Sequence, residues 1–233
     1  MVSFNYLVVK FTKIYFFHRI QWVYKMFKEI FGSIIIIILS SLMGIWLNDK
    51  FMGTLILSCG MLNIWYAVLN RNYNYIFGGI FYLLNAYISY INGLYGIAFL
   101  SLFVYFPLQI DGFIRWKEDI PIRKLSFHIS IFIIICLITS TIGFTLLLSK
   151  IPTQSLSILD ASSNIANICG LILMNLKYRE AWILWLINNI IDLIIWIVMC
   201  FGIGSNGLMM LIVSIGYLVM NIYGIREWRK SKV

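Results

Sequence analysis

The stretch AWILWLINNIIDLIIWIVMCF, residues 181–201, contains a single charged residue, Asp192. About 20 consecutive apolar residues are enough for a helix to cross the hydrocarbon core of a bilayer. The stretch therefore predicts a membrane-spanning helix. A carboxylate and amides at mid-span are too costly to face lipid, so we expect one face of this helix to turn toward other helices or a water-filled cavity.

Composition extends this prediction to the whole chain. Of its 233 residues, 61% are hydrophobic and 12% are charged, whereas soluble domains have roughly 45–50% and about 25%. This balance excludes a soluble domain and a disordered chain. The four cysteines lie in apolar runs without CxxC spacing, so neither disulfides nor a metal cluster is indicated, and no cofactor is expected.

Seven further apolar runs are separated by short polar turns, at residues 33–47, 51–69, 73–91, 94–116, 125–148, 158–176 and 208–225. Together with residues 181–201 they predict an all-α polytopic membrane protein with eight transmembrane helices. Residues 1–32 interleave five basic side chains with aromatic ones. We expect them to form a basic interfacial arm on the inner leaflet; a flexible tail is the alternative.

The lysines and arginines predict the orientation, because cytoplasmic loops carry them in excess. With the N-terminus inside, 16 of the 18 basic residues fall on the inner side, and only Lys50 and Lys150 fall outside. We therefore expect both termini to be cytoplasmic. The same asymmetry accounts for the net charge of +9, so no nucleic-acid partner is expected.

An internal repeat relates residues 51–117 to residues 157–228. Both halves reach an Asn-Gly-Leu turn, at 92–94 and at 206–208. Each half then closes with an amide, a glycine and a tryptophan at one spacing: Gln109, Gly112 and Trp116, and Asn221, Gly224 and Trp228. At an offset of 104, Phe81 falls on Trp185 and Asn85 on Asn189. Chance does not readily produce several such matches in register.

Two three-helix units separated by one helix must have the same orientation. Three crossings end on the opposite side of the membrane, and the linker helix returns the chain to the side on which the first unit began. The plan is thus 1 + 3 + 1 + 3: an extra helix at 33–48, a repeat at 51–117, a linker helix at 125–148, a repeat at 157–228 and a tail at 229–233. Parallel repeats are typical of transporters, with the substrate site near the midplane between the halves. A duplicated scaffold without a pore is the alternative.

The polar side chains of residues 181–201 share one helical face. Helical geometry places five of them within an arc of about 80°, with Asn188 at its edge. These five are Trp182, Trp185, Asn189, Asp192 and Trp196. Indoles stack against rings and attract cations, and an amide both donates and accepts hydrogen bonds. This stripe indicates a small, ring-containing polar ligand such as a nucleoside or a vitamin; interhelical hydrogen bonding is the alternative.

Other polar groups within spans are candidates by the same reasoning. Three further amides are assigned to the same site: Asn85, Gln109 and Asn221. Asn63 and Asn167 fall on corresponding helices, and we expect them to pair structurally. Asp160 is expected to be the N-terminal acid of its helix.

Sequence signals for an enzyme are missing. Walker A, HExxH and GxSxG motifs do not occur in the chain, and no Asp-rich metal motif is present. No chain of carboxylates is evident for ion coupling either. We therefore expect passive movement of a ligand down its gradient, without enzymatic activity.

The motif Trp182-x-x-Trp185-x-x-x-Asn189 resembles the WxxWxxxN/D motif of the PnuC-type vitamin transporters. The stretch from Tyr87 to Gly96, followed by Gln109 to Trp116, is similar to the first repeat of that family. The likeness covers roughly residues 52–230. It implies seven core helices in a 3 + 1 + 3 plan, with the first helix as an extra one that some members have.

The resemblance also implies a function and partners. Members form homotrimers in the bacterial cell membrane and carry nicotinamide riboside by facilitated diffusion, and a cytoplasmic kinase traps the imported substrate. Relatives carry thiamine, riboflavin or other nucleosides, which stay open as alternatives. A membrane-embedded receptor or enzyme without transport is the alternative from a different class.

Overall fold

The computed structural model describes residues 23, 26–47, 51–116, 120–203 and 208–230. An N-terminal helix, Met26–Trp46, precedes α2 (Phe51–Val68), α3 (Tyr73–Ile91), α4 (Tyr95–Leu100), η1 (Ser101–Tyr105), α5 (Phe106–Arg115), α6 (Phe127–Leu148), α7 (Ser157–Asn175), α8 (Ala181–Ile197), η2 (Val198–Ile203) and α9 (Leu208–Lys230). The described residues form no strand; they include one isolated β-bridge, between Arg123 and Tyr178. The predicted all-α class is confirmed.

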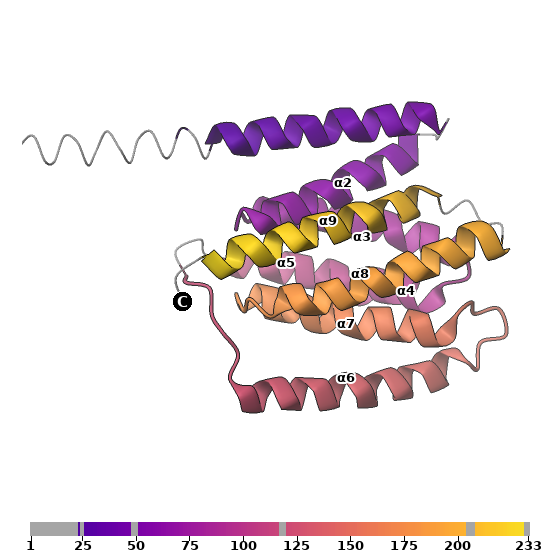
Figure 1. Ribbon diagram of the computed structural model, residues 1–233. Coiled ribbons are helices and arrows are strands. Elements are labelled where there is room, and N and C mark those ends of the chain that lie inside the picture. The colour runs from indigo at the N-terminus through magenta and orange to yellow at the C-terminus, as the bar shows by residue number, and fades with distance from the viewer. Residues whose placement is uncertain (1–22, 24–25, 48–50, 117–119, 204–207, 231–233) are drawn as a thin grey trace, which may run out of the picture.

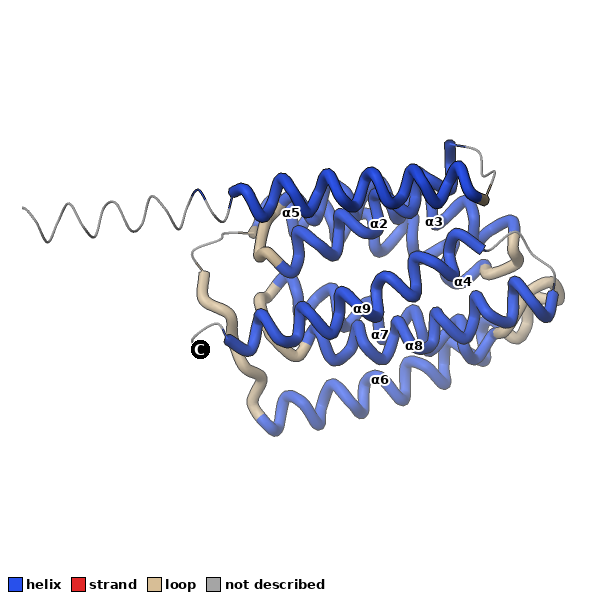
Figure 2. The backbone as a smooth tube through the Cα atoms, turned by 45° about the horizontal axis from the view of Figure 1, so that its top comes forward, coloured by secondary structure: helices blue, strands red, loops and turns tan. Residues whose placement is uncertain are grey.

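The helices lie side by side along one common direction (Figure 1). The N-terminal helix and α6 lie at opposite sides of the bundle, and Figure 2 shows the same order from a second direction. Seven of the described helices are long and apolar enough to cross a membrane. They include the N-terminal helix and α6, whose side chains are mostly exposed and apolar. In a membrane such faces contact lipid rather than water.

α3 is not among these seven helices, although it has 19 residues and no charged side chain. Its tyrosines, asparagines and glycines make it less apolar than the others. It is nevertheless a central helix, because it contacts α2, α4 and α5 and buries polar residues such as Asn74, Asn85 and Ser89. The prediction of eight spans therefore depends on this one helix.

The described part of the N-terminal helix includes residues 26–32, which precede the apolar run predicted to begin at residue 33. Two charged side chains among these residues have partners elsewhere in the bundle, one on α9 and one in the turn between α2 and α3. The Lys28 Nζ donates to the Tyr223 hydroxyl at 2.7 Å, and the Arg71 Nε lies 3.0 Å from Glu29 Oε2. The helix therefore extends past its apolar run. Residues 1–22, 24 and 25 of the predicted arm lie outside the described residues.

The predicted span at 94–116 is divided into α4, η1 and α5. The π-helical turn η1 ends one residue before Phe106, whose N–H bonds to the Ser101 carbonyl five residues back. Pro107 follows, and a proline in a regular helix would lack an N–H and collide with the carbonyl of the preceding turn. The wider turn relieves this conflict. Such π-bulges occur frequently at functional sites. It also brings Ser101 and Tyr105 into the buried interior.

Two glycine–aromatic contacts join α5 to α3 and α9 to α8. A Cβ at Gly112 would lie 2.1 Å from the Tyr75 ring, and a Cβ at Gly224 would lie 2.3 Å from the Trp182 ring. Each ring also meets a tryptophan edge-on: Tyr75 and Trp116 centroids are 5.4 Å apart, and Trp182 and Trp228 centroids are 5.7 Å apart. The glycines allow these helices to approach closely.

Gly224→Ala is expected to destabilise the protein, because Trp182 is fully buried and cannot move away from a new methyl group. Overpacking of this kind typically costs about 1–3 kcal/mol, which a lower melting temperature in detergent would report. Gly143→Ala on α6 is the matched control, since a Cβ there meets nothing within 4 Å. Equal melting temperatures for the two variants would show that the contact at Gly224 is not tight.

Candidate functional site

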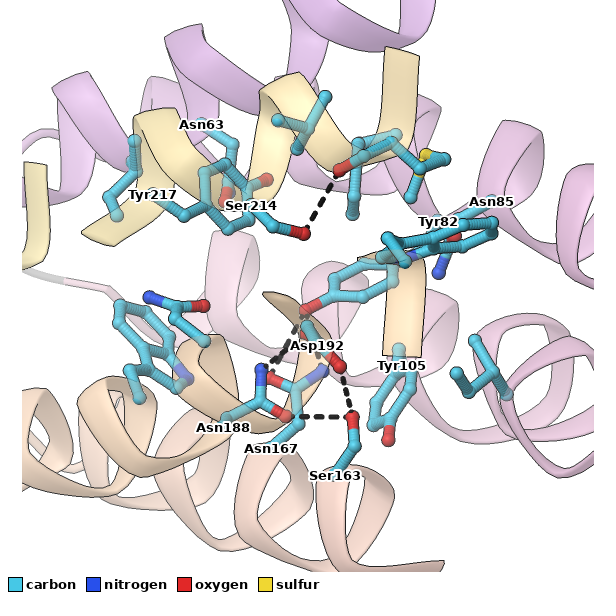
Figure 3. Close-up of a pocket in the computed structure, with 18 of the residues that line it drawn as sticks. Asn63, Tyr82, Asn85, Tyr105, Ser163, Asn167, Asn188, Asp192, Ser214 and Tyr217 are labelled. Atoms are coloured by element: carbon cyan, nitrogen blue, oxygen red, sulfur yellow. Dashed lines mark hydrogen bonds between the residues drawn. The ribbon is translucent and has the colours of Figure 1, made fainter. Parts of the chain in front are cut away.

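A cavity lies in the middle of the bundle, between side chains of α2, α3, α4, η1, α7, α8 and α9 (Figure 3). Its lining combines amides, aromatic rings, two hydroxyl-bearing serines and one carboxylate. The lining residues are Asn63, Ile64, Phe81, Tyr82, Asn85, Ile97, Tyr105, Ser163, Asn164, Asn167, Trp185, Asn188, Asn189, Asp192, Trp196, Met210, Val213, Ser214 and Tyr217. Such a set suits a ring with polar substituents, which needs both flat surfaces and hydrogen-bond partners.

The carboxylate of Asp192 is held by donors from its own helix and from α7. The Asn188 Nδ2 donates to Asp192 Oδ2 at 3.0 Å, and the Ser163 hydroxyl donates to Asp192 Oδ1. Ser163 also lies 2.9 Å from Asn188 Oδ1. Figure 3 shows these three side chains on one wall, opposite Ser214 and Tyr217 of α9. The arrangement is typical of an ionised acceptor fixed by two neutral donors.

Two tyrosines form another wall and are fixed by amides of α7. The Asn167 Nδ2 donates to the Tyr82 hydroxyl at 3.2 Å, and the Tyr105 hydroxyl donates to Asn164 Oδ1 at 2.6 Å. The two rings are tilted against each other with centroids 4.8 Å apart. Asn164 and Asn167 are three residues apart, so one face of α7 holds both rings.

Asn85 belongs to a smaller polar group between α3 and η1. Its Nδ2 donates to the Ser101 hydroxyl at 3.2 Å, and its Oδ1 accepts from the Ser89 hydroxyl at 3.3 Å. Ser89 and Ser101 are completely buried. Asn85 therefore has internal partners and also reaches the cavity.

Six of the nine predicted site residues line the cavity. They are Asn85, Trp185, Asn188, Asn189, Asp192 and Trp196. Trp182, Gln109 and Asn221 do not line it. Trp182 shares the helical face of the stripe, but Gly224 leaves room for its indole beneath α9, and the ring packs edge-on against Trp185 and Trp228.

Asn221 lies directly behind the cavity lining. In the amide orientation that pairs donors with acceptors, its Nδ2 donates to the Trp182 carbonyl at 2.9 Å and its Oδ1 accepts from Asn189 Nδ2 at 3.1 Å. Asn221 thus orients Asn189. Gln109 lies elsewhere, beside Gly78 of α3 and in a separate apolar pocket with Phe106 and Phe113.

The predicted pairing of Asn63 with Asn167 is wrong. The Asn63 Nδ2 donates to the Asn74 carbonyl at 2.8 Å, whereas Asn167 is bonded to Tyr82. Both amides line the cavity without being bonded to each other. Each amide instead bonds to a residue of α3, Asn63 to Asn74 and Asn167 to Tyr82.

Several lining residues were missed because their sequence signal is weak. Ser163, Asn164 and Asn167 form a polar face of α7, and their spacing of one and three residues could have indicated it. The residue type of Tyr82, Tyr105 and Tyr217 does not indicate a site, because tyrosines are also frequent where a membrane-spanning helix meets the interface. Only the packing of the helices brings them together.

The charge of the lining limits the ligands that the cavity suits. Asp192 is the single charged residue among the lining residues, and no lysine, arginine or histidine is present there. Within the described residues, no group of three or more His, Cys, Asp and Glu side chains could hold a metal ion. The lining side chains can therefore form hydrogen bonds, stack against a ring and attract one positive charge.

Solved and curated proteins resemble this chain over most of its length. The crystal structure of the Vitamin B3 transporter PnuC superposes with a TM-score of 0.78 at 26% identity, covering 90% of this chain and 95% of that one. The nicotinamide riboside transporter PnuC of Neisseria mucosa is 29% identical over 193 residues, 78% of this chain and 73% of the relative. The nicotinamide riboside transporter PnuC of Haemophilus influenzae is 28% identical over 166 residues, 67% of this chain and 70% of the relative.

The family model described as "Nicotinamide mononucleotide transporter" matches residues 50–230. This match includes every helix that contributes to the cavity and leaves out the N-terminal helix. It therefore covers the whole candidate site. The chain belongs to the nicotinamide mononucleotide transporter family.

Proposed function

We propose that this protein carries nicotinamide riboside across the membrane by facilitated diffusion, through the cavity between α3, α7 and α8. The observation that carries the proposal is the lining, which combines indole rings with a single charge, the carboxylate of Asp192. The nicotinamide ring of the riboside is a flat cation. Tryptophan faces attract such rings, and the amides pair with ribose hydroxyls or the carboxamide. Family membership agrees with the prediction that the chain is not an enzyme.

The same lining favours the riboside over its phosphorylated form. A phosphate carries about two negative charges near neutral pH, and burying it without a cation or several strong donors is costly. The lining has no basic side chain, and Asp192 would repel the phosphate. The nucleoside without its phosphate is thus the better match, although the family model is named for the mononucleotide.

Binding titrations with the purified protein test this choice. Nicotinamide riboside is expected to bind at least about tenfold more tightly than nicotinamide mononucleotide. Burying the unpaired phosphate should cost at least about 1.4 kcal/mol, which corresponds to a factor of ten in affinity. Thiamine, also a cationic aromatic, and riboflavin are the alternative ligands. Tighter binding of either one would replace nicotinamide riboside in the proposal, and binding without uptake into liposomes would support a receptor.

The transport mechanism and surroundings are proposed on the same basis. The cavity lining contains one carboxylate and so provides no chain of acidic groups for ion coupling. The resemblance supports a homotrimer in the bacterial cell membrane and a cytoplasmic kinase that phosphorylates the imported riboside. Trapping by the kinase would keep the inward gradient of the free riboside steep.

The repeat plan of 1 + 3 + 1 + 3 is also proposed, with residues 51–117 and 157–228 as the repeats, 125–148 as the linker and 229–233 as the tail. Two matching contacts support it. Gly112 faces Tyr75 of α3 as Gly224 faces Trp182 of α8. These contacts match Tyr75 to Trp182 at an offset of 107 residues, whereas Phe81 and Trp185 match at an offset of 104. The two helix pairs thus make similar contacts, although the offset between the repeats changes along the chain.

The proposed orientation, with both termini cytoplasmic, predicts which sites an impermeant thiol reagent reaches. After replacement of the native cysteines, Lys150→Cys should react in intact cells, because Lys150 is exposed beyond the end of α6. Lys230→Cys, exposed at the end of α9, should react only after the cells are permeabilised. The reverse pattern would overturn the orientation, and reaction of both sites in intact cells would overturn the span count.

A further inference from the structure

Asp160 is a completely buried carboxylate in the first turn of α7, and it does not line the cavity. It is more than the N-terminal acid that the sequence predicts, because it joins three segments of the chain. Its Oδ2 accepts from the backbone N–H of Gly96 at 3.1 Å and from Gln154 Nε2 at 2.6 Å. Its Oδ1 accepts from Asn164 Nδ2 at 2.5 Å.

These partners require a group that only accepts hydrogen bonds. Gly96 lies at the start of α4, and a Cβ there would be 2.8 Å from both carboxylate oxygens. Gln154 belongs to the loop between α6 and α7, and its Oε1 already accepts from the Tyr95 N–H at 3.0 Å. The orientation of the Gln154 amide is therefore fixed. Three converging donors leave no place for an NH2 group at position 160.

Asn164 connects this buried group to the cavity. Its Nδ2 faces Asp160, and its Oδ1 accepts from the Tyr105 hydroxyl at 2.6 Å. Asn164 and Tyr105 both line the cavity. A continuous hydrogen-bonded path thus leads from the α6–α7 loop, at the right-hand end of the bundle in Figure 1, through Asp160 to the cavity wall.

We propose that Asp160 is a positioning residue that fastens the α6–α7 loop and the start of α4 to the Tyr105 wall, and so holds the cavity closed at this end of the bundle. Its role in transport rests on the proposed function, in which this end faces the outside and must open for the ligand to enter. Without the acceptor at position 160, the buried donors lose their partner and the closed arrangement loses stability relative to an open one.

The test measures access to the cavity without any ligand, so its outcome does not depend on the identity of the substrate. Cys59, Cys136, Cys169 and Cys200 are replaced, and Ser214→Cys is introduced, since Ser214 lines the cavity and is 4% exposed. The rate of reaction with a membrane-impermeant maleimide is then measured from the outside. Asp160→Asn is compared with this background.

Asp160→Asn is expected to speed labelling about tenfold, the effect of leaving one buried donor without an acceptor. Asp111→Asn is the control, because that carboxylate is exposed on α5, pairs with Arg115 and has no bond to the described residues around Asp160. It should label at the background rate.

Two results would overturn the proposal. One is an unchanged labelling rate in folded Asp160→Asn, and the other is an Asp111→Asn variant that labels as fast as Asp160→Asn. If Asp160→Asn does not fold, Gln154→Ala gives an independent test, since it removes the bonds from the loop to Asp160 and to the Tyr95 N–H and leaves the carboxylate in place. Faster labelling of Gln154→Ala supports the proposal, and an unchanged rate contradicts it.

Discussion

Trp185→Ala is expected to weaken the binding of nicotinamide riboside about 30-fold, because a cation stacked on an indole in a desolvated site is worth about 2 kcal/mol. Trp185 lines the cavity from α8, and its ring is fixed on two sides. A Cβ at Gly170 would lie 2.5 Å from Trp185 Cδ1, and the Trp182 ring meets it edge-on with centroids 5.4 Å apart. Isothermal titration with the purified protein measures the effect.

Three further variants separate ligand binding from structural damage. Trp185→Phe should recover part of the loss, because a ring remains. Ile183→Ala should bind normally, since Ile183 is on the same helix but is 46% exposed. Trp46→Ala makes the same change as Trp185→Ala at a residue that is 75% exposed and away from the cavity. Normal binding by Trp185→Ala would exclude this indole from the site.

Asn189→Ala should have an intermediate effect, about threefold to tenfold, which is the contribution of one neutral hydrogen bond. Asn189 lines the cavity, and Asn221 holds its amide from behind. The melting temperature of this variant must be measured as well, because the substitution also removes a partner of Asn221. If Asn189→Ala binds normally but loses stability or assembly, the amide serves to join helices.

Asp192→Asn is the second substitution with a large expected effect, between about tenfold and a hundredfold in affinity. Asp192 is the single charge among the lining residues. A carboxylate about 8 Å from a unit positive charge, at an effective dielectric constant of about 20, contributes roughly 2 kcal/mol. The pyridinium ring of nicotinamide riboside loses this attraction when the carboxylate becomes an amide of almost the same shape.

The reduced riboside, whose ring has no positive charge, is the matched ligand for this variant. Its affinity should hardly change on Asp192→Asn, because the carboxylate attracts it only weakly. Ser163→Ala provides a second comparison, since it removes a donor to Asp192 and leaves the charge in place. Equal losses for the charged and the reduced riboside would show that Asp192 acts through packing or hydrogen bonding rather than through its charge.

The sequence predicts the helices of the bundle well because each helix must itself contain enough apolar residues to cross the bilayer. Runs of apolar residues predict the described helices to within a few residues, except in the first one, where residues 26–32 are also helical and contact α9 and the turn between α2 and α3. The sequence also predicts the polar stripe on α8, because Asn188, Asn189 and Asp192 at mid-span are too costly to face lipid. These features depend on local sequence.

The rest of the site depends on how helices pack, which local sequence does not show. Trp182 and Trp185 occupy similar positions in the motif, yet Gly224 of the neighbouring helix α9 leaves room for Trp182 in the core, whereas Trp185 lines the cavity. Tyr105 reaches the lining through the π-helical turn before Pro107. The role of Asp160 requires a loop and two helices to meet at one carboxylate.

Counterflow in proteoliposomes tests the central claim most directly. Vesicles that contain the purified protein are loaded with a high concentration of unlabelled nicotinamide riboside and diluted into a trace of the labelled compound, without ATP and without an ion gradient. A facilitated-diffusion carrier predicts that labelled riboside accumulates transiently inside and then leaves, and that Trp185→Ala slows this exchange. No accumulation, or accumulation only when a proton or sodium gradient is imposed, would contradict the account.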